Sequence, residues 1–262
     1  MSDDGSHIVR RFFCAESIIP IRSSPSESSE MISQLVFGDT VHQITTESSW
    51  TRIRHDYDGY EGWVDTKMLT ALPHDWEERD FSWSWVHQAH LVHPDGSKHH
   101  LPAASRVPLD PETGQIWDAK GRKVHFAKGA ILFDFEKYQP SLFEIAETFM
   151  HTPYVWGGCS GFGIDCSGFT QRVLRMTGRK IPRDSRPQEK EGIEIEWGQH
   201  QSGDLAFFSK PKQEKVTHVG IIKDRDYIIH ASGRVRVDAL SKFGIIHSED
   251  YILTHQLISI KR

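Results

Sequence analysis

Long apolar runs are missing from this chain: no stretch approaches the roughly 18 consecutive apolar residues that a membrane-spanning helix needs. We therefore expect no membrane span. The start, Met1–His7, is acidic and polar and has no apolar segment behind a basic one, so we expect no secretory signal and a cytoplasmic protein. Cysteine is scarce as well. Cys14, Cys159 and Cys166 are too few for a disulfide framework in 262 residues and fit a reducing compartment.

Basic residues are not in excess either. The chain has 31 Lys and Arg against 36 Asp and Glu, and this formal charge of −5 argues against nucleic acid as a partner. It contains no Cys-x-x-Cys pair and no helical His-x-x-x-His beside another ligand, so we expect no metal and no other cofactor. With 37% hydrophobic and 11% aromatic residues, the composition is that of a globular protein. The length suggests two domains, or three if some are small.

Short apolar alternations broken by turn signals run from Ile18 to about Leu72. Gly38-Asp39 and Asp58-Gly59 each precede an alternating segment, and the second of these is Tyr60-Glu61-Gly62-Trp63-Val64. This pattern predicts a small all-β barrel, in a first domain that covers residues 1–72.

A second β-like stretch of similar size runs from about Phe81 to Phe135. Its turn signals are Pro94-Asp95-Gly96, Pro111-Glu112-Thr113-Gly114 and Lys120-Gly121. The aromatic run Phe81-Ser82-Trp83-Ser84-Trp85 is typical of a barrel core, and a ligand platform is the alternative. We place this divergent second domain at residues 73–138.

The pattern becomes helical in the third domain, residues 139–262. Ser141 and Glu144 form a capping box at the start of a helix that stops before Pro153. A glycine-rich loop over 157–163 leads to a second helix, with Cys166 at its front and Gly178 as its stop. Strands are then predicted at 205–208, 218–222, 227–231 and 251–260. We expect an α+β domain with its helices before an antiparallel sheet.

Three polar motifs of this domain suggest thiol catalysis: Asp165-Cys166-Ser167-Gly168, His218-Val219-Gly220-Ile221 and His230-Ala231-Ser232. A helix N-terminus and a nearby imidazolium both favour the thiolate, so the position of Cys166 predicts a lowered thiol pKa. We expect the backbone N–H of Cys166 to form part of an oxyanion hole, whose second donor the sequence does not identify.

The pairing of two strands brings the histidines together. A three-residue turn centred on Asp224 would pair positions whose numbers sum to 448, which places His218 directly opposite His230. The hypothesis is that His218 is the base for Cys166, while His230 holds the tautomer of His218.

Each cysteine also has a plainer interpretation. A cysteine that opens a helix is often an inert buried residue, and this alternative weakens for Cys166 only because two histidine motifs accompany it. Cys159 is the competing nucleophile, but it lies inside the glycine-rich loop with no helix behind it. Cys14 is expected to be a packing residue.

At these residues the chain resembles the NlpC family of papain-like cysteine peptidases, which act on cell-wall peptides. The motifs that carry the resemblance are Pro153–Gly158, Asp165–Phe169, Pro182–Ser185, Gly203–Leu205, His218–Gly220 and His230–Ser232, together with the SH3-like strand Glu61–Val64. The fold that this implies is an α+β papain-like, NlpC-type domain preceded by two small all-β SH3-like barrels. The second barrel lacks the Gly-Trp-Val strand, so its assignment rests on size and position.

This arrangement is similar to the γ-D-glutamyl-L-diamino acid endopeptidases of murein-peptide recycling. The resemblance implies hydrolysis of the bond between D-glutamate and meso-diaminopimelate or lysine, in murein-derived peptides with a free N-terminal L-Ala. The catalytic residues would be Cys166, His218 and His230. Neither the third-position diamino acid nor the oligomeric state follows from the sequence.

The resemblance also implies substrate contacts. The candidates are Asp165, Ser167, Ser185 and Tyr154 of the third domain and, from the first barrel, Tyr60 and Glu30. Asp165 could instead only cap the helix, Tyr60 could cover the barrel, and Glu30 could be a solvated loop charge.

Two other functions remain open. One is a binding module in which the barrels dock wall fragments and the last domain is catalytically dead. The other keeps the thiol chemistry but makes the chain an amidase or an acyl transferase.

Overall fold

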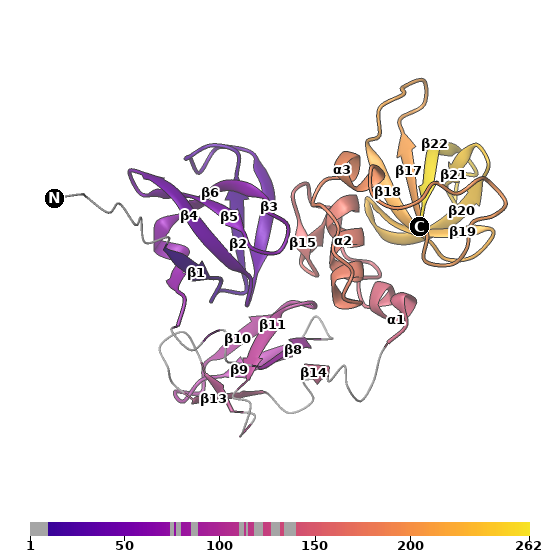
Figure 1. The fold of residues 1–262 in the computed structure, drawn as a ribbon. Coiled ribbons are helices and arrows are strands. Elements are labelled where there is room, and N and C mark those ends of the chain that lie inside the picture. Colours follow the sequence, from indigo (N-terminus) through magenta and orange to yellow (C-terminus); the bar gives the residue numbers. More distant parts are fainter. Residues whose placement is uncertain are drawn as a thin grey trace.

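The structure is a computed structural model that describes residues 10–73, 76, 80–84, 89–109, 113, 115–117, 123–126, 132–133 and 140–262. Two all-β regions are followed by a group of helices and a closed six-stranded barrel (Figure 1). No helix in these residues is both long and apolar enough to cross a membrane. The domain boundaries predicted after residues 72 and 138 stay predictions, and residues 138 and 139 lie outside the described ranges.

The first all-β region is an antiparallel sheet with the strand order β3-β2-β6-β5-β4-β1-β7. Its elements are β1 (Arg11–Phe13), β2 (Ile18–Arg22), β3 (Met31–Val36), β4 (Thr40–Glu47), β5 (Trp50–His55), β6 (Glu61–Asp65), the 3-10 helix η1 (Thr66–Met68) and β7 (Thr70–Ala71). Ile19, Leu35 and Val64 pack in its core. The expected all-β fold is confirmed, and β1, which lies before the predicted pattern, pairs with both β4 and β7.

The second all-β region contains two small sheets, with the orders β10-β9-β13-β12 and β11-β8-β14. Its strands are β8 (Asp80–Ser84), β9 (Ala89–Val92), β10 (Lys98–Leu101), β11 (Arg106–Leu109), β12 (Ile116–Trp117), β13 (Lys123–Phe126) and β14 (Leu132–Phe133). The turn predicted at Pro94–Gly96 joins β9 to β10. Apart from Thr113, the turns predicted at 111–114 and 120–121 lie outside the described residues, as does Trp85 of the aromatic run.

The third region begins with the two predicted helices. Ser141 and Glu144 form the expected capping box at α1 (Leu142–Glu147), and Cys166 is the first residue of α2 (Cys166–Met176). The short strands β15 (Cys159–Ser160) and β16 (Gly163–Ile164) lie in the glycine-rich loop before α2, and α3 (Ser185–Glu189) follows it. Figure 1 shows α2 between the first sheet and the barrel.

The antiparallel sheet predicted after the helices closes into a barrel. Its strands are β17 (Leu205–Ser209), β18 (His218–Ile222), β19 (Tyr227–Ser232), β20 (Arg234–Ser241), β21 (Gly244–Ile246) and β22 (Leu253–Lys261). Strands β20 and β21 are additions to the four expected strands. Successive side chains of a strand point to opposite faces, and both faces of β17 are buried: Phe207 packs with α2, while Phe208 belongs to a second cluster with Ile222 and Ile228.

A buried carboxylate joins the first sheet to α2. Asp39 accepts hydrogen bonds from Arg172 at 3.0 Å and from Arg175 at 2.6 Å, and a second bond runs from Gln171 to Asp58 at 2.8 Å. Burial alone would raise the pKa of Asp39, but the two arginines hold it well below its usual value. The first region is therefore fixed directly to the helix that carries Cys166.

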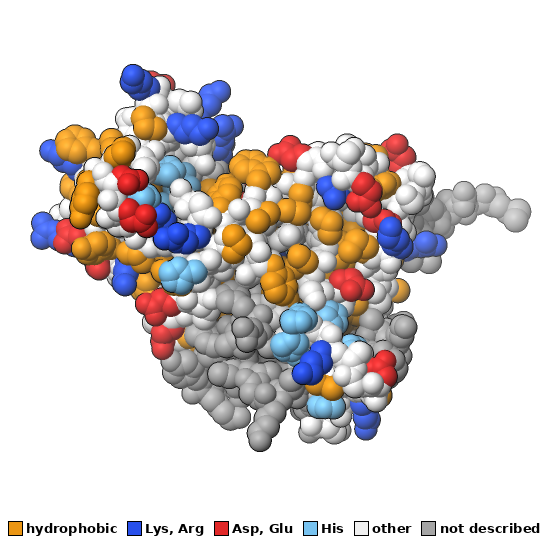
Figure 2. All heavy atoms as spheres, turned by 180° about the vertical axis from the view of Figure 1, so that it is seen from behind, with side chains coloured by type: hydrophobic (Ala, Val, Ile, Leu, Met, Phe, Trp, Pro, Cys, Tyr) orange, Lys and Arg blue, Asp and Glu red, His pale blue; other side chains and the backbone are white. Residues whose placement is uncertain are grey.

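Figure 2 views the molecule from behind. Apolar side chains gather in the middle of this face, between the barrel and the first sheet, and most Lys and Arg side chains lie towards its margins. The face where the regions meet is therefore less charged than its surroundings.

Candidate active site

Asp165 places the candidate nucleophile at the start of α2. Its side chain caps the helix by accepting a hydrogen bond from the Gly168 N–H at 2.7 Å. The same carboxylate accepts from the Gly157 N–H at 2.9 Å and pairs with Arg183 at 2.7 Å. The capping role that we weighed for Asp165 is thus present, and both carboxylate oxygens already have partners.

Arg183 connects this cap to the first sheet. Its guanidinium is buried, and besides Asp165 it donates to the hydroxyls of Ser167 at 3.0 Å and Ser33 at 2.9 Å. Ser167 in turn donates to Asp165 at 3.3 Å. The backbone around Cys166 is therefore held by side chains from two regions of the molecule.

Two histidines and an aspartate form a buried chain of hydrogen bonds. The His218 Nε2 lies 2.8 Å from the His230 Nδ1, and the His230 Nε2 lies 3.0 Å from the Asp238 Oδ2. Burial would raise the pKa of Asp238, but hydrogen bonds from His230 and from the Ser248 N–H lower it to about 2, so the carboxylate is ionised and only accepts.

The ionised carboxylate sets the tautomer of both rings. Because Asp238 can only accept, the His230 Nε2 carries a proton, and a neutral His230 then accepts at Nδ1. The proton between the two rings is therefore on the His218 Nε2. This leaves the His218 Nδ1 unprotonated and able to act as a base.

The strand register differs from the prediction. His230 pairs with Gly220, not with His218, so paired numbers sum to 450 and the turn is centred on Arg225, one residue later than expected. The rings meet as diagonal neighbours on one face of the sheet. A Cβ at Gly220 would lie 2.8 Å from the His230 Cβ, so this position needs glycine to leave room for the ring.

Burial decides the charge state of the candidate pair. It raises the pKa of the Cys166 thiol to about 12, with a further rise from Asp165, although hydrogen bonds from the backbone of Val219 and Ser167 lower it. The shift in the thiol pKa is therefore opposite to the predicted direction. Burial also lowers the pKa of His218 well below its usual value, helped by His230 and His255. A neutral thiol faces a neutral imidazole.

His255 of β22 is a further residue of the site that the sequence analysis did not identify. Its ring stacks on His218 with the centroids 4.2 Å apart and the planes 27° from parallel. Burial lowers the pKa of His255 to about 4, so the ring is uncharged at neutral pH. An uncharged ring stacked on His218 restricts its rotation and adds no charge beside it.

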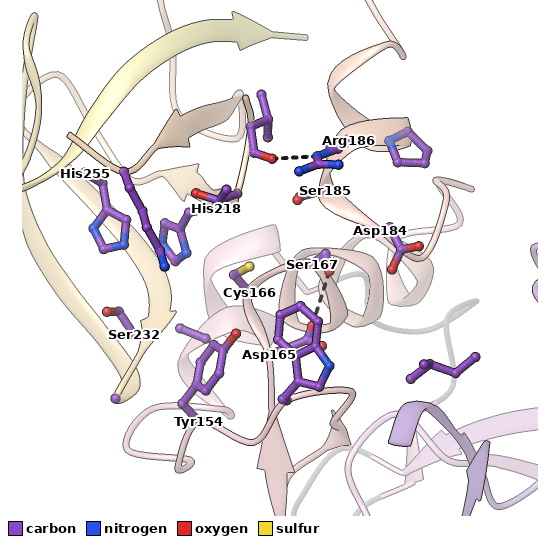
Figure 3. Close-up of a pocket in the computed structure, with 18 residues that line it drawn as sticks. Tyr154, Asp165, Cys166, Ser167, Asp184, Ser185, Arg186, His218, Ser232 and His255 are labelled. Atoms are coloured by element: carbon purple, nitrogen blue, oxygen red, sulfur yellow. Dashed lines mark hydrogen bonds between the residues drawn. The ribbon is translucent and has the colours of Figure 1, made fainter. Parts of the chain in front are cut away.

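Cys166 and His218 line one cavity of about 690 Å³. Of the predicted substrate contacts, Tyr154, Asp165, Ser167 and Ser185 line this cavity. Figure 3 shows Cys166 between two groups of side chains, with His218, His255 and Ser232 on one side and Asp184, Ser185 and Arg186 on the other.

The two predicted contacts from the first barrel reach the cavity through intermediates. Tyr60 donates to Asp184 at 3.4 Å, and Glu30 accepts from the Trp156 indole at 2.6 Å. Asp184 and Trp156 themselves line the cavity. Both residues lie in motifs that carry the family resemblance, but neither was predicted to contact the substrate. Asp238 had no such signal, because the strand that carries it was not predicted.

The remaining cysteines lie outside the cavity lining. Cys159 is 1% exposed, and its sulfur lies 3.5 Å from the Ser33 hydroxyl, at the contact with the first sheet. Cys14 is buried in the core of the first sheet, as expected for a packing residue. Among the residues that the structure describes, no three His, Cys, Asp or Glu side chains are grouped so as to hold a metal ion.

Comparison with known proteins gives two family matches and several relatives. Residues 151–251 match the NlpC/P60 family, and residues 21–69 match the bacterial dipeptidyl-peptidase SH3 domain. The γ-D-glutamyl-L-lysine dipeptidyl-peptidase of Bacillus cereus is 27% identical over 79% of this chain and 68% of its own length. The protein of the same name from Bacillus subtilis is 28% identical over 76% of this chain and 71% of its own length.

Solved structures show the same fold. An NlpC/P60 family protein from Bacillus cereus superposes with a TM-score of 0.80 at 22% identity, and the match covers 96% of this chain and 99% of that one. An NlpC/P60 endopeptidase from Photobacterium damselae gives a TM-score of 0.73 at 16% identity, over 99% of this chain and 73% of that one. The chain therefore carries an NlpC/P60 domain behind an N-terminal bacterial SH3-like domain, and it is a cysteine peptidase.

Proposed function

We propose that this protein hydrolyses the γ-D-glutamyl–diamino acid bond of murein peptides that have a free N-terminal L-Ala. The observation that carries the proposal is that one cavity contains a thiol at the start of helix α2, an imidazole with an unprotonated Nδ1 and, beyond the thiol, an available carboxylate at Asp184. The two Bacillus relatives are named for a γ-D-glutamyl-L-lysine bond, which supports the same class of substrate.

Acylation begins from the neutral pair. The Cys166 thiol gives its proton to the His218 Nδ1 as the sulfur attacks the γ-carbonyl carbon, which forms a tetrahedral oxyanion. The backbone N–H of Cys166 at the helix start donates to this oxygen. Burial raises the pKa of the Tyr154 hydroxyl, which keeps its proton, and Figure 3 shows it pointing towards Cys166 as a second candidate donor.

The imidazolium then completes the first half of the reaction. His218 gives its proton to the nitrogen of the diamino acid, the C–N bond breaks, and the glutamyl group stays on Cys166 as a thioester. Through His230, the carboxylate of Asp238 stabilises the imidazolium that forms in this step. A water molecule, deprotonated by His218, hydrolyses the thioester and releases L-Ala-D-Glu.

Asp184 is the proposed acceptor for the substrate ammonium. The oxygens of Asp165 are occupied by Arg183 and backbone N–H groups, whereas among the described residues only the Tyr60 hydroxyl donates to Asp184. A carboxylate with spare acceptor capacity binds an ammonium through a charge-assisted hydrogen bond, whereas an acetylated amine is neutral and lacks that attraction. Glu30 accepts a hydrogen bond from the indole of Trp156, which also lines the cavity.

Selection of a free amine supports a role on released wall fragments. An L-Ala amine is bonded to the glycan in intact murein and becomes free only after an amidase has acted. We therefore place the protein in cell-wall peptide recycling, and the proposed location is the cytoplasm.

The test is mass spectrometry of purified protein incubated with L-Ala-γ-D-Glu-diaminopimelate. We expect release of L-Ala-D-Glu from this peptide and none from its N-acetylated form. Cys166→Ala should abolish turnover and leave the free energy of unfolding close to that of the parent, and Cys159→Ala is the matched control that should keep activity.

Each other outcome points to a different function. Binding of the peptide without cleavage would make the protein a binding module. Transfer of the L-Ala-D-Glu group to an added amine in place of water would make it an acyl transferase. Equal cleavage of the acetylated peptide would contradict amine selection.

A further inference from the structure

The residue that leaves during acylation must lie beside the group that protonates it. On the proposed function this group is His218, so the third-position residue occupies the His218 side of the cavity. Ser232 and His255 line that side, and so do two residues next to paired strand positions: Lys210 follows Ser209, which pairs with Gln256 beside His255, and Thr217 directly precedes His218. Figure 3 shows Ser232 and His255 beside His218, with Cys166 between them and Asp184.

Lys210 provides the charge on this side. The other charged side chains of the cavity lining are Asp165, which is paired with Arg183, and Asp184 and Arg186, which lie at α3 on the far side of Cys166. Burial keeps His255 uncharged at neutral pH. Among the described residues no carboxylate pairs with the Lys210 ammonium.

The charged groups of the cavity therefore differ between its two sides. The carboxylate of Asp184, with Arg186 near it, lies on one side of the sulfur, and the Lys210 ammonium lies on the side of His255. A peptide bound with its N-terminal ammonium at Asp184 presents its third residue to Lys210. Complementary charges at both ends fix the direction in which the peptide lies.

We propose that Lys210 binds the side-chain carboxylate of the third-position residue and so selects meso-diaminopimelate over L-lysine. This assignment rests on the proposed function and adds a substrate preference to it. It differs from the L-lysine in the names of the two Bacillus relatives.

The two diamino acids differ at the end of the side chain. Lysine ends in an ammonium alone, which Lys210 repels, and no acidic side chain lines this side of the cavity among the described residues. Diaminopimelate ends in an ammonium and a carboxylate, and the carboxylate can accept a charge-assisted hydrogen bond from Lys210. The α-carboxylate of the third residue has the same chemistry, so an experiment must separate the two sources.

The experiment measures kcat/KM of parent and Lys210→Met proteins on two tripeptides, L-Ala-γ-D-Glu followed by meso-diaminopimelate or by L-lysine. We expect the parent to prefer diaminopimelate by about tenfold, and Lys210→Met to bring the ratio close to one, mainly by losing activity on diaminopimelate. Lys215→Met changes a lysine of the same β17–β18 connection that is outside the cavity lining, and it should keep the parental ratio.

A second pair of peptides carries an amidated α-carboxyl group. If the preference and its loss in Lys210→Met persist with these peptides, the side-chain carboxylate is the group that Lys210 binds. If amidation removes the effect of Lys210→Met, the α-carboxylate is bound and the assignment is overturned.

The assignment and the proposed function fail in different ways. Cleavage of both tripeptides at equal rates by parent and Lys210→Met proteins overturns the assignment and leaves the peptidase function intact. Cleavage of neither tripeptide by the parent refutes the proposed function, and the assignment with it.

Discussion

The two ends of the cavity are built in different ways. The relay end, formed by His218, His230 and Asp238, comes entirely from neighbouring strands of the barrel and is buried. The amine end, formed by Asp184, Tyr60, Trp156 and Glu30, spans two regions of the molecule and is more exposed. The relay end depends on the register within one sheet, while the amine end depends on how the first sheet docks. We therefore expect chemistry and substrate selection to be separable by mutation.

The largest effect is expected at the relay end. Asp238→Asn removes the ionised acceptor and lets His230 present the wrong tautomer to His218, so kcat should fall by about 10³- to 10⁴-fold with little change in KM. Steady-state kinetics on the diaminopimelate tripeptide measures both constants.

Arg236→Gln is the matched control for this change. It removes the ion pair at the other oxygen of Asp238, at 3.0 Å, and keeps the carboxylate. We expect its kcat to stay within a few-fold of the parent. A comparable loss in both variants would mean that Asp238 supports the fold and does not set the tautomer.

The docking of the first sheet gives the next largest effect. Asp39→Asn leaves Arg172 and Arg175 buried without their counter-charge, and the free energy of unfolding in urea should fall by about 3–5 kcal/mol. Asp56→Asn, at a more exposed ion pair with Arg11, should cost less than about 1 kcal/mol. Equal losses from both variants would contradict a docking role for Asp39.

At the amine end the effect should fall on substrate binding. Asp184→Asn removes the charge that attracts the ammonium, so KM for the free-amine tripeptide should rise by about 10- to 100-fold with kcat largely kept. Tyr60→Phe, which removes a 3.4 Å hydrogen bond to Asp184, should raise KM less. Parental KM in both variants would place the ammonium elsewhere, and Asp165 and Glu30 are then the acidic candidates.

The smallest expected effect is on how stability depends on pH. The buried histidines beside Cys166 and the buried His55 of the first sheet should respond to pH in opposite directions. Burial lowers the pKa of His218 and His230, and that of His255 to about 4, so below pH 6.5 the unfolded chain takes up protons that the folded chain does not. The free energy of unfolding from these residues is therefore lost as pH falls.

His55 lies beside Asp39, where the first sheet contacts α2. Burial lowers the pKa of His55, but Asp39 and Asp58 raise it overall, so its contribution to stability is present below pH 6.5 and lost at higher pH.

Urea unfolding of the parent and of His55→Gln and His255→Gln at pH 5.5 and 8.5 measures this contrast. His55→Gln should cost more stability at pH 5.5 than at pH 8.5, while His255→Gln should reduce the loss of stability at pH 5.5. If His55→Gln lowers the free energy of unfolding equally at both pH values, the proposed charge on the His55 ring is contradicted.

Local patterns predicted the position of Cys166 well. The capping pattern at Ser141 and Glu144 and the Asp165 cap depend on residues three apart, and both are present in the structure. Burial of the thiol depends on distant segments, and for this reason the predicted direction of its pKa shift was wrong.

The register error has a similar cause. The sequence predicted that His218 and His230 share a face, which needs only the alternation of a strand, but it placed them directly opposite each other. The turn between them is centred one residue later than expected, on Arg225, and the missing side chain at Gly220 allows the diagonal contact. Asp238 was missed because β20 was not predicted, although Gly233 before it and the alternation of arginine and valine at its start are signals of a turn and a strand.

The sequence by itself determined which groups can react, one cysteine at a helix start and two histidines on the same face of neighbouring strands. It also determined the order of the two β-rich segments before them. Those features follow from contacts between residues close along the chain or from side-chain alternation. Only the tertiary structure decided the tautomer at His218, the neutral state of the thiol, the carboxylate left available at Asp184 and the position of Lys210 across the sulfur from it. These depend on burial and on the docking of separate regions, whose energies come from contacts between residues that are far apart in the sequence.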